Sequence, residues 1–595
     1  MSDERSNSNL KQGVKGIFSS TFWQLVVVYT ALVVLISFSL FWKYSLHFEL
    51  FAVVIAVIGA MALYHSEDDE KEKLDKHLHY MLLALGILIV LTFRMIPYLN
   101  GNTIPLGYDA GIYKYGIESF SAQGFGVDDW VKSAMSPGFL YLLVPLLKMG
   151  VSSEFILTWA FIFFGVLLGV SIYFAGKAYF GNRTAVIALL LYAVSAIQFK
   201  VFTYMYYKNV IALAFLFFAL YFLKRNEDFR ASVFSGAHSV HKQRVSVVSA
   251  HPPALKRDGN DNSYSESGGA GKWESESKSG EGTERLKGWN FYRFFFIVFG
   301  VLVGIMHLPT FFIFGVAYVL FIFYNRKNFG KKFVDGALIL GLTLLLYVGF
   351  WNEAILPLIK PVAESFVEPG TAPGTFISFF VYQFSTLYIL PFAILGFAHL
   401  LWQRKFDMLF FLTLVTGIIV YFQFFFFNRF IIHLDVFLIV LAASAFSLMI
   451  ANSKKLGIAI LVLMLVSSGY VAFQDSVNAK PLITEESLNL IKMINLNVEG
   501  DARIMVVSSE YSPWVLAYSN RGTIAPGLFE ENKWTQADWE KFWNSNSTDE
   551  TKSLMSVYPK GEQVYIFVGT KSFNNPCFSE FLSNGSSKLL RYNCE

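Results

Sequence analysis

Residues 80–98 read YMLLALGILIVLTFRMIPY, an apolar run that precedes the polar stretch NTIPLGYDAGIYKYGIESFSAQG over residues 102–124. About 20 apolar residues in a helix cross the roughly 30 Å of hydrocarbon in a bilayer. The first run therefore predicts a transmembrane helix, and the second predicts an acidic, aromatic loop at the membrane surface.

Similar apolar runs recur along most of the chain. Hydrophobic residues make up 54% of the 595 residues and charged residues only 15%, whereas a typical globular domain carries about 25% charged residues. This composition predicts an α-helical polytopic membrane protein of about 13 transmembrane helices. The spans are expected near residues 22–42, 46–64, 80–98, 154–175, 184–200, 208–223, 291–306, 309–324, 334–351, 376–400, 407–426, 430–450 and 456–473.

Composition and charge predict that the chain contacts membrane lipid and not nucleic acid. The net charge is only +4 and no run of basic residues suits a phosphate backbone. The 62 Phe and 30 Tyr residues suit helices that face lipid tails and place rings at the headgroup level. Walker-type GxxxxGK[ST] and HExxH patterns are missing from the sequence, which disfavours an ATP-driven pump and a zinc protease.

Lysine and arginine residues predict the orientation, because they collect in cytoplasmic loops. With the N-terminus in the cytoplasm, every basic cluster falls inside if residues 137–150 form a juxtamembrane helix at the outer surface. Lys11 and Lys15 precede a span without a cleavage site, so we expect it to remain as an anchor. The basic residues are Lys71, Lys73, Lys76, Lys177, Arg183, Lys224, Arg225, Arg326, Lys327, Lys331, Lys332, Arg404, Lys405, Lys454 and Lys455.

Two segments read as soluble. Residues 226–288 are rich in Ser, Gly and Glu and predict a disordered cytoplasmic loop. After the transmembrane domain of residues 1–473, residues 474–595 predict a small extracytoplasmic α/β domain. EESLNLIKMINL reads as an amphipathic helix, ARIMVVSS and QVYIFVGT read as buried strands, and turns are expected at Pro513, Gly522 and Gly527.

Both cysteines of the chain fall in this terminal domain. An oxidising compartment would let Cys577 and Cys594 form a disulfide, although two free thiols remain the alternative. Asn546 and Asn584 begin glycosylation sequons on the same side, whereas Asn182 begins one that is expected in the cytoplasm.

The loop over residues 99–153 holds the first candidate for chemistry. Asp109 stands between Gly107 and Gly111, which allow a close approach of backbone or ligand. A carboxylate there could accept a proton from an attacking hydroxyl, and Tyr108 and Tyr113 beside it could stack on sugar faces. The alternative is a loop acid that caps the helix after it.

The order of these features resembles the GT-C superfamily of lipid-phosphate-sugar glycosyltransferases, in particular its archaeal members. The resembling features are the GYDAGIYKY loop after an early span, a Pro-led juxtamembrane helix, a span that ends in GKAYFGNRTA, and an outer terminal domain. Over residues 80–473 the chain is similar in architecture to protein O-mannosyltransferases and aminoarabinose transferases. The resemblance implies an inverting transfer from a polyprenyl-phosphate sugar at the outer face.

In that family the first-loop acid, which Asp109 matches, acts as a base or as a ligand of a divalent metal such as Mg²⁺ or Mn²⁺. Many protein O-mannosyltransferases carry two adjacent acids here, but Ala110 follows Asp109 and Glu118 is nine residues away, so a single-acid mechanism is expected. SSEYSPWVLAYSNRGTIAPG is similar to the outer domain of oligosaccharyltransferases, yet it lacks the acid of their WWDYG motif.

A lipid phosphate needs cations at the outer end of the bundle. Lys208, His307 and Arg429 are expected there, on the same side as Asp109. The alternative is that Lys208 and Arg429 snorkel to the interface and that His307 is a satisfied turn histidine. His433 and Asp435 lie one turn deeper, where they could pair with each other or with Arg429.

The sequence therefore predicts a membrane glycosyltransferase that moves a sugar from a polyprenyl-phosphate donor, expected to be dolichyl phosphate, to a lipid-linked glycan or a protein at the outer face. Oligosaccharyl transfer to protein is a lesser alternative. A non-enzymatic transporter or lipid flippase is another, but the paired Gly or Pro breaks that repeated transporter halves predict are not seen.

Overall fold

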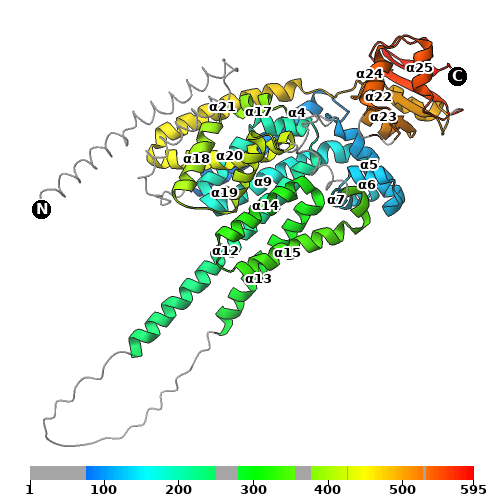
Figure 1. Cartoon of the computed structure of the whole chain (residues 1–595). Helices are drawn as coiled ribbons and strands as arrows, with labels where there is room; N and C mark the ends of the chain where they lie inside the picture. The colour runs from blue at the N-terminus through cyan, green and yellow to red at the C-terminus, as the bar shows by residue number, and fades with distance from the viewer. Residues whose placement is uncertain are drawn as a thin grey trace, which may run out of the picture.

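A computed structural model describes residues 75–248, 279–355, 377–386, 388–424, 427–526, 529, 531–559 and 561–594. The spans predicted at 22–42 and 46–64 lie outside these residues. The described chain forms a helical bundle with a small domain of mixed helices and strands at one end (Figure 1).

The bundle is built from helices of very different lengths. They are α4 (Lys76–Leu99), α5 (Asp109–Gln123), η2 (Gly124–Gly126), α6 (Asp129–Ala134), α7 (Pro137–Lys148), α8 (Ser153–Phe155), η3 (Ile156–Ala160), α9 (Phe161–Phe180), α10 (Asn182–Ala193), α11 (Ala196–Thr203), α12 (Tyr207–Val248), α13 (Ser279–Met306), α14 (Leu308–Tyr324), α15 (Phe329–Leu346), η4 (Val348–Phe350), η5 (Trp351–Ile355), α17 (Phe379–Thr386), α18 (Leu390–Trp402), α19 (Met408–Tyr421), α20 (Phe427–Asn452) and α21 (Lys454–Asn478).

Several of these helices suit a bilayer. Within the described residues, 5 helices are long and apolar enough to cross a membrane, or up to 8 if each bent pair counts as one span. Shorter apolar helices of 10–17 residues, among them α7, α14 and α19, lie beside them. The chain is thus a multi-pass membrane protein, and each predicted span between residues 80 and 473 falls on one of these helices, bent pairs or shorter apolar helices.

Three predicted spans are broken where we expected one straight helix. Asn182–Ala193 and Ala196–Thr203 meet at 52°, the two parts of Phe329–Ile355 at 56°, and Phe379–Thr386 and Leu390–Trp402 at 81°. At the first break the Ser195 side chain accepts a hydrogen bond from the Gln198 amide and starts a new helix. At the third, Pro391 stands in the first turn of α18, where a missing N–H costs no helical hydrogen bond.

The predicted disordered loop over 226–288 is wrong at both of its ends. Helix α12 continues to Val248 and α13 begins at Ser279, whereas residues 249–278 lie outside the described part. A helix that has already nucleated inside the bundle adds one hydrogen bond per further residue. Polar composition alone therefore did not end it. This α12–α13 pair extends from the bundle away from the small domain (Figure 1).

The terminal domain holds a five-stranded mixed sheet in the order β2-β1-β3-β5-β4. Strands β2 and β3 pair in parallel with β1, and β5 pairs antiparallel with both β3 and β4. Its elements are α22 (Glu485–Asn497), β1 (Arg503–Val506), α23 (Ser512–Ser519), β2 (Gly522–Ile524), α24 (Gln536–Asn544), α25 (Thr548–Met555), β3 (Val564–Gly569), β4 (Phe578–Asn584) and β5 (Ser587–Tyr592).

Alternate residues of the central strands face two separate layers, as the period of two along a strand requires. Ile504 and Phe567 pack in the same cluster as α22, α23 and the bundle. Met505 and Ile566 pack instead in a second cluster with Trp539 of α24. The domain is therefore a sandwich of helices, sheet and helices, and one of its faces continues the core of the membrane bundle.

The predicted strands and amphipathic helix appear as β1, β3 and α22, but two predicted turns do not. Pro513 lies in the first turn of α23, and Gly522 is the first residue of β2. Gly527 lies outside the described residues. Proline is favoured in the first turn of a helix as well as in turns, so the residue type did not separate the two.

A disulfide ties the two ends of the last hairpin. Cys577 immediately precedes β4 and Cys594 follows β5 by two residues, and their Cα atoms are 5.0 Å apart.

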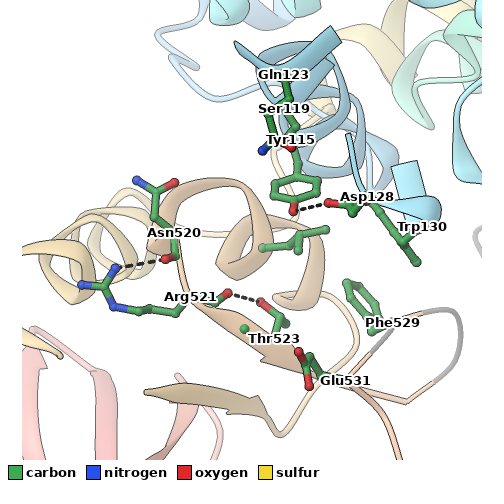
Figure 2. Close-up of a pocket in the computed structure, with 12 residues that line it drawn as sticks. Tyr115, Ser119, Gln123, Asp128, Trp130, Asn520, Arg521, Thr523, Phe529 and Glu531 are labelled. Atoms are coloured by element: carbon green, nitrogen blue, oxygen red, sulfur yellow. Dashed lines mark hydrogen bonds between the residues drawn. The ribbon is translucent and has the colours of Figure 1, made fainter. Parts of the chain in front are cut away.

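The terminal domain packs tightly on the first loop of the bundle. Helix α23 lies against α5 so closely that a Cβ added at Gly111 would meet the Pro513 carbonyl oxygen at 2.2 Å. Only glycine permits this approach of the two backbones. Beside the contact, α5 and α6 on one side and α23 and β2 on the other enclose a pocket (Figure 2).

Candidate active site

Asp109 opens α5, the helix that the terminal domain holds in place. It stands in the first helical turn without a capping hydrogen bond, where the helix dipole favours a carboxylate. One turn later, the Tyr113 hydroxyl donates to Asp109 Oδ2 at 3.4 Å. Gly107, just before the helix, lies against the backbone of Tyr204, where an added Cβ would approach within 2.6 Å. Asp109 thus stands at the start of a helix, as the alternative interpretation of the sequence predicted. The N-cap position, however, is Tyr108, and no side-chain hydrogen bond caps α5.

Two cations from distant parts of the chain act on Asp109. Lys208 lies in the first turn of α12 and Arg429 in the first turn of α20, and both charges act on the Asp109 carboxylate and on each other. The Lys208 ammonium donates to the Ala134 carbonyl oxygen at 2.8 Å and lies 5.7 Å from the centre of the Tyr113 ring. The structure therefore brings together an acid and two bases that lie up to 320 residues apart in sequence.

The surroundings raise the pKa of Asp109. Burial is the largest cause, and the Lys208 and Arg429 cations oppose it. All three side chains keep part of their surface accessible. A carboxylate with a raised pKa is a better proton acceptor than a free aspartate, and its partial exposure leaves it open to a ligand.

Tyr113 has a different place from the one we predicted. Its side chain is only 2% exposed and packs against Phe139, with ring centroids 4.9 Å apart, and against Tyr207. A ring enclosed in this way offers no face to a sugar, so the predicted stacking role is wrong. Tyr113 instead holds Asp109 and lies beneath Lys208. Tyr108, at the N-cap of α5, is partly exposed and still available.

His307 belongs to a short chain of polar groups under the cations. It is the N-cap of α14, and its Nδ1 lies 2.8 Å from Thr310 Oγ1, which lies 2.7 Å from His433 Nε2. The charges of Lys208 and Arg429 reach His307. Sequence reasoning missed Thr310, although its position three residues after a helix-starting histidine is a capping signal.

Asp435 does not pair with His433, as we had considered. Its Oδ2 accepts hydrogen bonds from Gln198 at 2.8 Å and Ser195 at 3.1 Å. The acid is thus held by neutral groups of α11 and its cap, because the start of α11 and α20 pack against each other.

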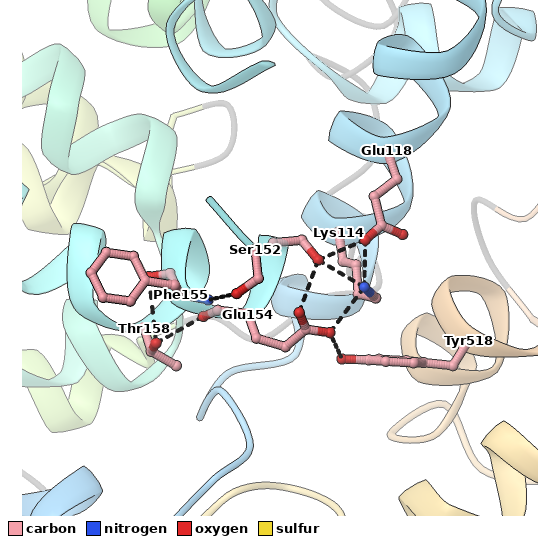
Figure 3. A network of polar contacts seen from close by, with 8 residues as sticks. Lys114, Glu118, Ser152, Glu154, Phe155, Thr158 and Tyr518 are labelled. Carbon is pink, nitrogen blue, oxygen red and sulfur yellow. Dashed lines mark hydrogen bonds and ion pairs between the residues drawn. The ribbon is translucent and has the colours of Figure 1, made fainter. Parts of the chain in front are cut away.

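A second polar network fixes α5 to the rest of the molecule (Figure 3). Lys114 donates to Glu118 at 2.5 Å and to Ser153 at 2.8 Å, and it forms an ion pair with Glu154 at 3.0 Å. Tyr518 of α23 donates to Glu154 at 3.0 Å and places its ring 4.7 Å from the Lys114 ammonium. Glu118 is therefore engaged here and away from Asp109. Sequence reasoning did not single out this network.

Among the described residues, no set of ligands for a metal ion forms at the site. Nowhere in the described chain do three or more His, Cys, Asp or Glu side chains gather as ligands of one ion. Within the described chain, the charged groups that act on Asp109 are Lys208 and Arg429. These two cations would repel a third positive charge. We therefore derive no step through a metal ion.

Several helices begin at this site. Asp109, Lys208 and Arg429 stand in the first turns of α5, α12 and α20, and His307 is the N-cap of α14. A helix N-terminus carries partial positive charge and free N–H groups. Two cations at such ends make a place suited to an anion, next to a carboxylate that can accept a proton.

The chain matches a known family model over part of its length. The model for dolichyl-phosphate-mannose-protein mannosyltransferases matches residues 134–237, a stretch that includes Lys208 but not Asp109. No curated protein matches the sequence.

Solved structures with the same fold cover more of the chain. The apo oligosaccharyltransferase of Archaeoglobus fulgidus is 13% identical with a TM-score of 0.55, over 83% of this chain and 70% of that one. The oligosaccharyltransferase AglB of the same organism, in complex with an inhibitory peptide and a dolichol-phosphate, has a TM-score of 0.56 at 12% identity, over 85% and 70%. ArnT from Cupriavidus metallidurans has a TM-score of 0.51 at 11% identity, over 86% and 97%.

These likenesses agree with the resemblance seen in the sequence. Residues 134–237 match the mannosyltransferase family model, and the chain shares the fold of AglB and ArnT.

Proposed function

We propose that this protein transfers a sugar from a polyprenyl-phosphate donor, with dolichyl phosphate as the expected carrier, to a lipid-linked glycan or a protein. The observation that supports this proposal is the cluster of Asp109, Lys208 and Arg429. It combines a proton acceptor with two cations at the starts of three helices. A proton acceptor beside an anion site is what a displacement at a sugar phosphate requires.

In this mechanism Asp109 accepts the proton of the acceptor hydroxyl. The hydroxyl oxygen attacks the anomeric carbon from the face opposite the phosphate and forms the new glycosidic bond. The bond between that carbon and the phosphate oxygen breaks, and the electron pair leaves with the lipid phosphate. Lys208 and Arg429 stabilise the charge that develops on this phosphate. A single displacement of this kind inverts the configuration of the sugar.

The neighbouring groups have supporting roles in the proposal. Tyr113 orients the carboxylate through its hydroxyl and supports Lys208 through its ring. His307 would donate to the phosphate, because its Nδ1 accepts from the Thr310 amide and its proton is then on Nε2. Tyr108 stays partly exposed and could stack on the transferred sugar.

The reaction is proposed to take place at the outer face, with the N-terminus in the cytoplasm and the terminal domain outside. The distribution of Lys and Arg supports this orientation. A disulfide between Cys577 and Cys594 agrees with an oxidising compartment for the domain. The site lies on the side of the bundle that carries this domain, away from the α12–α13 extension (Figure 1).

Oligosaccharyl transfer to protein is the second candidate, and the fold shared with AglB favours it. One observation argues against it. Trp514, the residue that comes nearest to the WWDYG motif in the sequence, is only 1% exposed and lies between Pro513 and Val515. A buried indole without the neighbouring acid has no group to offer an acceptor peptide, so we favour transfer of a sugar from a monophosphate carrier.

The test is sugar transfer in membranes that carry the wild-type protein or the Asp109→Asn variant. Polyprenyl-phosphate donors with labelled mannose, glucose or aminoarabinose are supplied one at a time, with endogenous acceptors. Transfer by the wild type that is lost in the variant supports both the class and the base. Equal transfer by both proteins removes Asp109 as the base, and transfer only from diphosphate-linked oligosaccharides favours the second candidate.

A further inference from the structure

The pocket between the first loop and the terminal domain is separate from the acid and its cations. It measures about 400 Å³, within the range of pockets that take small ligands. Helices α5 and α6 provide one wall, and α23, β2, Phe529 and Glu531 provide the other (Figure 2). Because the Lys114 network and the Gly111–Pro513 contact already join these parts, the pocket belongs to a fixed interface.

One side of the pocket is a platform of aromatic rings. Trp130 stacks on Phe529 at 19° with ring centroids 6.3 Å apart, and Tyr115 meets Trp130 edge-on at 5.8 Å. Phe529 is buried, whereas Trp130 and Tyr115 keep part of their surface accessible. Phe529 thus covers part of one face of the indole, while Trp130 and Tyr115 keep apolar ring surface accessible at the pocket.

Polar groups surround this platform. The Tyr115 hydroxyl donates to Asp128 Oδ2 at 2.9 Å, while Asp128 Oδ1 caps the Val131 amide at 2.8 Å. Ser119 and Gln123 add a hydroxyl and an amide from α5, and Glu531 adds a carboxylate from the far wall. Each carboxylate oxygen can accept a second hydrogen bond, so these groups can still receive hydroxyl donors.

We propose that this pocket binds sugar residues of a glycan acceptor. A saccharide combines apolar C–H faces, which pack on rings, with many hydroxyls, which donate to carboxylates and amides. The inference rests on the proposed function, and it specifies the acceptor as a glycan.

The pocket binds a part of the acceptor that does not react. Tyr115 lies six residues beyond Asp109 on α5, about 9 Å along the helix at a rise of about 1.5 Å per residue. Ser119 and Gln123 lie farther along the same helix. Helix α5 thus connects the proposed base to the pocket. Binding of remote sugar residues would orient the reacting hydroxyl at Asp109.

An extended peptide fits the pocket less well. A peptide would add to the free edge of β2, but Thr523 is 3% exposed and Ile524 is fully buried. The Glu531 side chain lies 3.7 Å from a Cβ added at Gly522, so it packs over the face of the sheet at this strand. The nearby Arg521 guanidinium donates to carbonyl oxygens of Asn520 and Val498, so it is directed away from the pocket (Figure 2).

The experiment is saturation-transfer NMR on the full-length protein in lipid nanodiscs. The probes are methyl α-mannoside, α-1,2-mannobiose and N,N′-diacetylchitobiose, together with an Asn-X-Thr hexapeptide as the competing class. We compare the wild type with Trp130→Leu and Asp128→Asn, which keeps the helix cap. Trp543→Leu, at a partly exposed indole of α24 outside the pocket, is the matched control. A melting curve is measured for every variant.

We expect at least one disaccharide to bind the wild type, the Asp109→Asn variant and the Trp543→Leu control with similar affinity. Trp130→Leu should weaken that binding about tenfold or more, because truncating an anchoring aromatic ring typically costs over 1 kcal/mol. Asp128→Asn should weaken it less. If Trp130→Leu unfolds the protein, the Asp128→Asn result decides.

Three results would overturn the proposal: no saccharide binds the wild type, both pocket variants bind like the wild type, or only the peptide binds. None of them affects transfer from a polyprenyl-phosphate donor in membranes. Conversely, saccharide binding by a protein that transfers no sugar would keep the pocket and reject the proposed function.

Discussion

Two aspartates of the bundle, one facing a residue of α20 and one inside that helix, have partners that differ in kind. Asp109, at the start of α5, faces the cations Lys208 and Arg429 and keeps part of its surface accessible. Asp435, inside α20, is 1% exposed and accepts hydrogen bonds only from the neutral side chains of Ser195 and Gln198 among the recorded donors of the described chain.

The difference separates an acid with a structural role from the acid that we propose to be reactive. Neutral donors satisfy the oxygens of Asp435 and connect α11 to α20, but they leave no space for a substrate. The cations at Asp109 belong to α12 and α20, which are helices of the bundle, and part of the carboxylate surface stays accessible. Burial of an acid is therefore a weak sign of function by itself, and the character of its partners decides.

The sharpest test exchanges each acid for its amide. Asp109→Asn should lower the transfer rate by about 100-fold or more, because general-base catalysis contributes about 10²–10⁴. Asp435→Asn should change the rate by less than about twofold, since a single amide oxygen can accept both of the bonds that Asp435 Oδ2 accepts now. Initial rates of labelled sugar transfer measure both.

Melting temperatures provide the control for that pair. Burial raises the pKa of Asp109, so at neutral pH its ionised form opposes folding, and Asp109→Asn should be at least as stable as the wild type. A variant with normal stability and no transfer points to chemistry. A similar loss of transfer in Asp435→Asn would contradict the comparison.

The next largest effect is expected from the cations. Lys208→Met should raise the KM for the donor and lower kcat, with a combined loss in kcat/KM of about 10- to 100-fold, since a hydrogen bond to a charged group contributes about 1.5–3 kcal/mol. Arg429→Lys keeps a positive charge and should lose less than Arg429→Gln. If all of these variants kept the donor KM of the wild type, the phosphate would bind elsewhere.

The pH dependence of transfer follows from the same charges. Asp109 must be ionised to act as a base, so the rate should fall as the pH decreases through its pKa, which burial raises above the ordinary value. Lys208 and Arg429 lower this pKa, so Lys208→Met should move the acidic limb to higher pH. Asp435→Asn should leave the limb in place. A profile in Lys208→Met that moves to lower pH would contradict the electrostatic coupling.

The smallest effect concerns the support of α5. Tyr518→Phe removes the hydrogen bond to Glu154 and keeps the ring beside Lys114. A hydrogen bond to a charged carboxylate contributes about 1.5–3 kcal/mol, but this one acts on Asp109 only through α5, so the rate should fall by about two- to tenfold. Tyr470→Phe, at an exposed tyrosine of α21, is the matched control. A higher KM for the acceptor with an unchanged kcat would place Tyr518 in acceptor binding and not in support of the base.

Sequence was sufficient for the broad architecture and for the residues near Asp109. Hydropathy and the distribution of Lys and Arg placed Asp109, Lys208, His307 and Arg429 at one side of the bundle, and their charges do interact in the structure. Their proposed roles still depend on the experiments above.

Several of the errors share a physical cause, which is contact between distant segments. Tyr113 looked available in the sequence but is enclosed by Phe139 and Tyr207. Its burial depends on helices that local patterns do not place. The pocket at Trp130 likewise needs Phe529 from the terminal domain. Helix breaks such as that at Ser195 depend on caps that a hydropathy average conceals.

The contact between Tyr518 and Glu154 joins residues 364 positions apart, and it has a consequence for how the protein is made. Asp109 emerges from the ribosome long before α23, the helix that holds α5. The terminal domain must reach the side of the first loop and fold there before α5 is fully supported. A chain that has not yet reached α23, or that is truncated before it, therefore lacks this support of α5, and the site around Asp109 is left incomplete.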